Sequence, residues 1–138
     1  MWYKALCVSM ILIGVLSACS NKDDSPTHGY SDFEHLDHWD DLKLLTGTKT
    51  IIYYYSPFCD ICIQLEEPVT KLLSQLEPYR DIRLADDGYL YGAGEPEFEL
   101  FGVPALIILK DGAFYELIRG SRPVLDYLEY EIEILSNQ

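Results

Sequence analysis

Positive charge is scarce in this sequence. Lys and Arg number 10 against 23 Asp and Glu, which gives a formal net charge of −13 at pH 7. An acidic surface repels phosphate, so the composition argues against nucleic-acid binding. The acidic residues are spread along the chain rather than gathered in one tail, which indicates a solvated surface that favours solubility. The charge therefore argues against nucleic acid as a partner and does not identify another partner.

The sequence also offers little to a membrane-spanning helix. The apolar run from Ala5 to Val15 is shorter than the ~20 residues that such a helix needs. It follows a head that carries Lys4 and precedes the small residues Ser17 and Ala18. This order is typical of a secretory signal peptide, which we predict over 1–18. The polar stretch 19–30 is predicted to be a flexible tether, and 31–138 a single domain.

The end of the predicted signal peptide, Leu16-Ser17-Ala18-Cys19, resembles the bacterial lipobox. The resemblance implies that Cys19 carries the lipid, palmitate included, and becomes the new N-terminus. The protein would then be anchored to the extracytoplasmic face of a cell membrane. An ordinary signal peptide that happens to contain a cysteine is the alternative. Ser20 follows the cysteine in place of the Asp of an inner-membrane retention signal, and whether the membrane is inner, outer or sole stays open.

Cysteines are few, and their positions are informative. The sequence has 4, at 7, 19, 59 and 62. Cys7 lies in the predicted signal peptide and Cys19 is the predicted lipid site, so the mature domain holds one pair in an oxidising compartment. A disulfide between Cys59 and Cys62 closes almost no loop and constrains the unfolded chain little. The pair is therefore better suited to reversible exchange than to structural cross-linking.

Residue patterns predict an α/β layer architecture. Thr50 to Tyr55 is β-branched and aromatic throughout, as in a central strand buried on both faces. We interpret its three tyrosines as core residues rather than a stacking surface. Asp111-Gly112 is a strong hairpin signal. The expected elements are a helix from about 31 to 47, strand 50–55, helix 59–76, strand 81–85, short helix 96–101, strands 105–109 and 113–118, and a helix from Pro123.

The cysteine pair stands where a buried strand meets an amphipathic helix, in Ser56-Pro57-Phe58-Cys59-Asp60-Ile61-Cys62. A thiol reacts as its thiolate, and a helix N-terminus favours negative charge. Cys59 at that terminus is thus the predicted nucleophile. Cys62 lies one helical turn further on the same face, where it can attack a mixed disulfide formed on Cys59.

With this motif the sequence resembles the thioredoxin superfamily. The segment Phe101 to Gly112, which contains Val103-Pro104, resembles the family's cis-proline segment and the hairpin after it, and Gly120 matches a further family glycine. The resemblance implies a thioredoxin-like α/β fold, with a mixed central β-sheet flanked by helices. It implies a cis Val103–Pro104 bond beside the cysteine pair, and a substrate groove that Val103, Pro104 and Phe58 form.

Several residues depart from the family pattern. Tyr53 stands where thioredoxin has a buried Asp that helps to deprotonate the second cysteine, and Phe58 replaces the usual Trp. Asp60, next to Cys59, disfavours a thiolate there and so stabilises the reduced form less. This favours a reductant or isomerase over a strong oxidant. The base that deprotonates Cys62 stays open between Glu66 and a water.

The sequence thus predicts a thiol-disulfide oxidoreductase that acts on secreted or surface proteins and is recharged by a membrane redox partner. No cofactor is needed, because the cysteine pair holds the electrons. The main alternative is a non-catalytic accessory lipoprotein that uses the fold as a docking surface. A copper-handling protein fits less well, since no His follows Cys62, and haem attachment would need a His where Ile63 stands. No metal is predicted, because the three His residues lack closely spaced partner ligands.

Overall fold

The computed structural model describes residues 28–87 and 102–138. Several sequence predictions lie outside these residues: the signal peptide, most of the tether, the lipid site Cys19 and the short helix over 96–101. Within the described ranges, no helix combines the length and the apolar character needed to cross a membrane.

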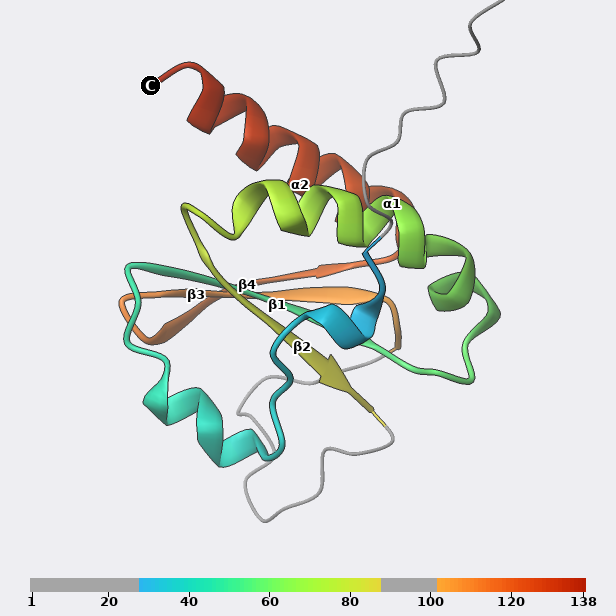
Figure 1. The fold of residues 1–138 in the computed structure, drawn as a ribbon. Coiled ribbons are helices and arrows are strands. Elements are labelled where there is room, and N and C mark those ends of the chain that lie inside the picture. Colours follow the sequence, from blue (N-terminus) through green and yellow to red (C-terminus); the bar gives the residue numbers. More distant parts are fainter. Residues whose placement is uncertain (1–27, 88–101) are drawn as a thin grey trace, which may run out of the picture.

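A four-stranded mixed sheet forms the centre of the domain (Figure 1). Its strands stand in the order β2-β1-β3-β4, with β1 parallel to β2 and antiparallel to β3, and β3 antiparallel to β4. The predicted fold class is confirmed. The bounds are β1 Lys49–Tyr55, β2 Asp81–Asp86, β3 Ala105–Lys110 and β4 Ala113–Arg119.

The central strand β1 is buried on both faces, as its composition predicts. Ile51, Ile52 and Tyr53 are all 0% exposed. Successive strand residues point to opposite faces, so Ile51 and Tyr53 pack in one core and Ile52 and Tyr54 in another. The interpretation of the tyrosines as packed residues is confirmed, since Tyr55 is buried and Tyr54 half-buried.

Both long helices cover the same face of the sheet (Figure 1). These are α1, Asp60–Leu76, and α2, Ser121–Ser136. Val69 and Leu73 of α1 pack with Val124 and Leu128 of α2, and all four side chains are 0% exposed. We call this cluster the helix-side core. It also contains Cys62, so the packing of the helices fixes the position of the predicted site.

The predicted helix from about 31 to 47 is wrong. The segment instead forms two 3-10 helices, η1 Tyr30–Asp32 and η2 Trp39–Leu44, with a bridge between His35 and Leu84 of β2. Phe33 packs in the helix-side core, whereas Leu36 and Trp39 pack against the opposite face of the sheet. One straight helix cannot present side chains to both faces, so the chain crosses the edge of β2 in an extended conformation.

The hairpin between β3 and β4 follows its sequence signal. Asp111 and Gly112 have φ angles of 51° and 78°. Two successive residues with positive φ are the requirement of the two-residue turn that matches the strand twist, and Asp-Gly meets it at low steric cost. The turn fixes the register of β4 on β3.

A buried carboxylate lies at the end of the sheet where β1 begins. Glu131 of α2 has a side chain 2% exposed, and it pairs with Lys49 and, at 3.3 Å, with Arg80. Burial opposes ionisation of Glu131, but the hydrogen bonds from Lys49, Arg80 and Tyr127 outweigh it and lower the pKa of the carboxyl. The group therefore holds α2 onto β1 and onto the segment before β2.

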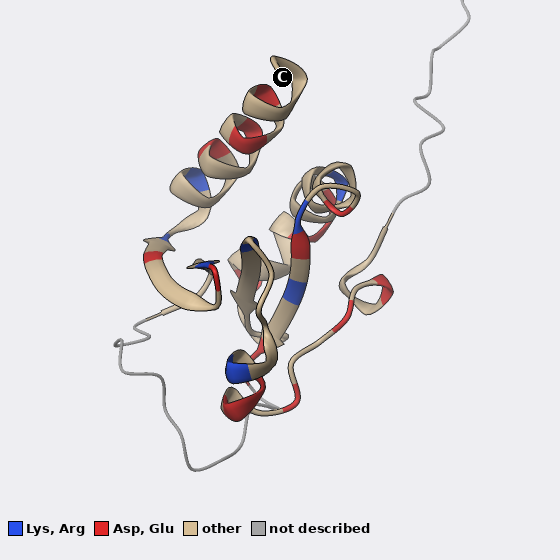
Figure 2. Ribbon diagram, turned by 90° about the vertical axis from the view of Figure 1, so that its left-hand side faces the viewer, with Lys and Arg blue, Asp and Glu red and all other residues tan. Residues whose placement is uncertain are grey.

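Acidic residues occur on both long helices and on the N-terminal segment of the described structure, with fewer Lys and Arg among them (Figure 2). This distribution agrees with the solvated acidic surface that the composition indicates.

Candidate active site

The cysteine pair is positioned by a tight turn between β1 and α1. The Cys59 N–H donates to the Ser56 carbonyl at 3.2 Å, and the Phe58 N–H donates to Ser56 Oγ at 3.3 Å. Pro57 occupies the second position of this turn, where its fixed φ is favourable. The turn places Cys59 as the N-cap of α1, immediately after the buried strand.

The two cysteines are free thiols in direct contact. Cys62 Sγ donates to Cys59 Sγ at 2.7 Å, and the Cys62 N–H donates to the same sulfur at 3.2 Å. Cys59 is partly exposed and Cys62 is 0% exposed. The accessible sulfur at the helix N-terminus thus accepts two hydrogen bonds, one of them from the buried thiol of Cys62. This asymmetry suits a nucleophile and a resolving thiol.

Burial raises the pKa of the Cys62 thiol to about 12, and the hydrogen bond to Cys59 adds to the rise. The nearby charge of Asp87, which follows β2, acts in the same direction. The Ser56 backbone opposes the shift but does not cancel it. Cys62 therefore keeps its proton at neutral pH until Cys59 has reacted.

The raised pKa predicts how the stability of the reduced protein depends on pH. The unfolded thiol titrates near 9.0 and the folded one near 12. The folded state thus binds more protons between these values, and stability present below pH 9 is lost as pH rises towards 12. We expect reduced wild-type protein to lose more stability between pH 8 and pH 11 than reduced Cys62→Ser, in urea unfolding. Equal losses would show that the thiol is not shifted.

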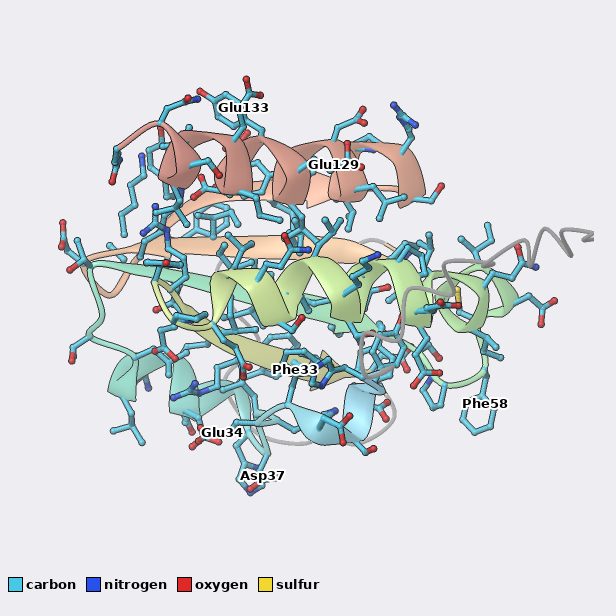
Figure 3. The ribbon with its side chains drawn as sticks, turned by 45° about the horizontal axis from the view of Figure 1, so that its top comes forward. Phe33, Glu34, Asp37, Phe58, Glu129 and Glu133 are labelled. Atoms are coloured by element: carbon cyan, nitrogen blue, oxygen red, sulfur yellow. The ribbon has the colours of Figure 1, made fainter. Side chains whose placement is uncertain are left out.

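The structure describes all three residues of the predicted groove, which are Phe58, Val103 and Pro104. Phe58 is 87% exposed and points away from the domain at the start of α1 (Figure 3). The Val103–Pro104 bond is cis, which confirms the expectation from the resemblance. Pro104 is buried, and Val103 packs against the helix-side core together with Cys59. Their role in a substrate groove stays a prediction.

Tyr53 fills the position of the missing buried acid. Its hydroxyl lies 3.0 Å from the Tyr30 hydroxyl, and the Tyr30 O–H donates to the Cys62 carbonyl at 2.7 Å. Burial raises the pKa of both phenols, so both stay neutral. The sequence gives no indication of a role for Tyr30, because no local pattern links it to Cys62, which lies 32 residues away. The absence of the acid at position 53 was the one signal that another group was needed here.

The remaining candidate groups have other partners. Glu66, a predicted base for Cys62, accepts the Tyr30 N–H at 3.0 Å. His35 lies 2.8 Å from the Tyr55 hydroxyl, and His28 lies 3.7 Å from Asp32. In residues 28–87 and 102–138, no three His, Cys, Asp or Glu side chains are grouped to hold a metal ion.

No family model and no curated protein matches the sequence. Several solved structures, however, are similar to the structure of this chain. Oxidised mitochondrial thioredoxin 3 of Saccharomyces cerevisiae aligns with a TM-score of 0.63 at 23% identity, over 76% of this chain and 97% of that one. Thioredoxin of Trypanosoma brucei brucei gives 0.62 at 14%, over 79% and 95%. Thioredoxin of Fasciola hepatica gives 0.59 at 18%, over 73% and 97%.

The chain has the thioredoxin fold. The alignments span almost the whole of each thioredoxin. Identities this low establish the architecture alone. Within the thioredoxin fold, the Cys59–Cys62 pair and cis Pro104 are the groups on which a chemical proposal rests.

Proposed function

We propose that this protein is a thiol-disulfide oxidoreductase that exchanges disulfides with protein substrates through Cys59 and Cys62. The observation that carries the proposal is the contact between the two free thiols at the N-terminus of α1, one partly exposed and one buried. Only an exposed sulfur can reach a substrate disulfide, and only a neighbouring sulfur can release the product. The pair meets both requirements.

The reaction has two steps. Cys59, as thiolate, attacks a substrate disulfide; a bond forms between Cys59 Sγ and one substrate sulfur, and the other sulfur leaves with the electron pair. Cys62 then loses its proton and attacks Cys59 Sγ, which breaks the mixed disulfide. The second substrate sulfur leaves as a thiolate and takes up a proton. The substrate disulfide is reduced and the cysteine pair is oxidised, without a cofactor.

The surroundings of the pair support a partner that is a protein. Phe58, Ile61 and Ile63, which adjoin the cysteines in the sequence, have exposed side chains that offer apolar contact to a polypeptide. Val103 and Pro104 would form the other wall of the groove.

We further propose that the chain is anchored by lipid at Cys19 on the extracytoplasmic face of a membrane, acts on secreted or surface proteins, and is recharged by a membrane redox partner.

The reduction potential of the pair tests the proposal. The full chain with Cys7→Ser and Cys19→Ser is equilibrated in dithiothreitol or glutathione buffers, and free thiols are counted by alkylation and mass. We expect a value near or below about −250 mV, that of a reductant. A value near about −120 mV would mark a dedicated oxidant and overturn the interpretation of Asp60. Failure to form an intramolecular disulfide in any buffer would overturn the function.

The same titration isolates the effect of Asp60. Asp60→Asn removes a negative charge beside the reactive sulfur, so it should stabilise the reduced form and raise the potential above that of the wild type. Glu129→Gln, an exposed change on α2, is the matched control and should leave the potential unchanged.

A further inference from the structure

The hydrogen bond from Tyr30 joins two distant parts of the chain. Tyr30 lies in η1, at the start of the described structure, and its hydroxyl reaches the backbone carbonyl of Cys62 in the first turn of α1. Tyr30 is 8% exposed and Cys62 is 0% exposed. The bond is thus shielded from water, which makes it stronger than a comparable surface contact.

The directions of the hydroxyl bonds follow from counting protons. Tyr30 has one hydroxyl proton, and the carbonyl of Cys62 can only accept, so that proton goes to Cys62. The 3.0 Å contact between the two hydroxyls must then be a bond from Tyr53 to Tyr30. The result is a directed chain from β1, through η1, to the active-site helix.

Both tyrosines are themselves fixed in place. The Tyr30 N–H donates to Glu66 on α1, and the ring of Tyr30 lies 4.3 Å from that of Tyr55 and 5.5 Å from that of Tyr53, centroid to centroid. Just before Tyr30, the His28 carbonyl accepts the Thr70 hydroxyl at 2.6 Å. The segment that bears Tyr30 is therefore attached to α1 at three points.

We propose that Tyr30 and Tyr53, the tyrosine pair, position Cys62 for its attack on the mixed disulfide. The inference rests on the proposed function. In the second step Cys62 Sγ must approach Cys59 Sγ in line with the disulfide bond between Cys59 and the substrate. A sulfur held out of this line attacks slowly. The first turn of a helix is prone to fray, because its N–H groups lack the internal partners that its carbonyls have. The Tyr30 bond holds the Cys62 backbone, and Tyr53 holds the Tyr30 hydroxyl. The pair replaces the missing acid as a positioning device rather than as a base.

A coloured leaving group separates the two steps. The full chain with Cys7→Ser and Cys19→Ser is reduced and mixed with a symmetrical nitrobenzoate disulfide, whose thiolate absorbs visible light. Attack by Cys59 releases the first coloured thiolate, and attack by Cys62 releases the second. Stopped-flow absorbance then records two phases, one for each sulfur.

We expect Tyr30→Phe, which keeps the ring and loses the hydroxyl, to leave the first phase unchanged and to slow the second about fivefold, as for one lost hydrogen bond. Tyr53→Phe should slow the second phase by less. Tyr54→Phe is the matched control, since Tyr54 is on the same strand but faces the opposite core, and both phases should match the wild type.

Two results would overturn the inference. One is a second phase at the wild-type rate in Tyr30→Phe. The other is an equal slowing of both phases, which would indicate a structural role only. If Tyr30→Phe does not fold, Tyr53→Phe decides by the same criteria. A wild-type protein that shows no second phase at all would instead overturn the proposed function, and the inference with it.

Discussion

Cys59→Ser is expected to reduce exchange with a peptide disulfide to the uncatalysed rate, whereas Cys62→Ser should keep the first attack and accumulate the mixed disulfide. The difference follows from exposure, because Cys59 is partly exposed and Cys62 is buried beneath it. Serine at position 62 cannot displace the substrate sulfur, so the covalent intermediate persists. Non-reducing gels and intact mass distinguish the free, mixed and intramolecular disulfide forms.

Gln64→Ala, an exposed change on the same helix, serves as the control and should exchange at the wild-type rate. The serine variants also test the rival function. If cells that carry Cys59→Ser and Cys62→Ser keep the full biological role of the protein, the fold acts as an accessory docking module and the exchange chemistry is incidental.

Glu131→Ala is expected to cost about 3 kcal/mol of unfolding free energy. Loss of one partner from a buried ion pair leaves the other uncompensated, at about 3–5 kcal/mol. Here the side chains of Lys49 and Arg80 are each 19% exposed, so water reaches them and the lower end applies. Urea unfolding at pH 7, with linear extrapolation to water, measures the change.

The matched control for this prediction is Glu129→Ala. Glu129 is an exposed residue of the same helix and lies on its outer side (Figure 3), so its removal should change stability by less than about 0.5 kcal/mol. A loss below about 1 kcal/mol for Glu131→Ala would mean that the two cations are fully solvated and that the carboxylate does not hold α2 in place.

The sequence predicted correctly those elements whose burial follows a single regular pattern. The composition of β1 matches its burial on both faces, and Asp111-Gly112 favours the two-residue turn that the structure shows. The bounds of α1 and the start of α2 were predicted closely, because each helix buries a single apolar stripe. The Cys59–Cys62 contact follows directly from helical spacing.

Two features could not be predicted from local patterns. The apolar residues of 31–47 approximate helical spacing, but Phe33 and Trp39 serve opposite faces of the sheet, which only the tertiary structure decides. The bond from Tyr30 to Cys62 spans 32 residues and depends on where that segment crosses the sheet edge. Tyr53 showed that the buried acid is missing, and the structure shows which hydroxyls occupy its place.

The path of the N-terminal segment also bears on aggregation. The outer edge of β2 would otherwise present unpaired backbone groups, which can template pairing with another chain. Leu84 instead accepts the Leu36 N–H at 2.8 Å and donates to the Glu34 carbonyl at 2.9 Å. The bridge at His35 thus satisfies the middle of this strand from within the same molecule. At high concentration the protein should therefore resist strand addition between neighbouring copies along this edge.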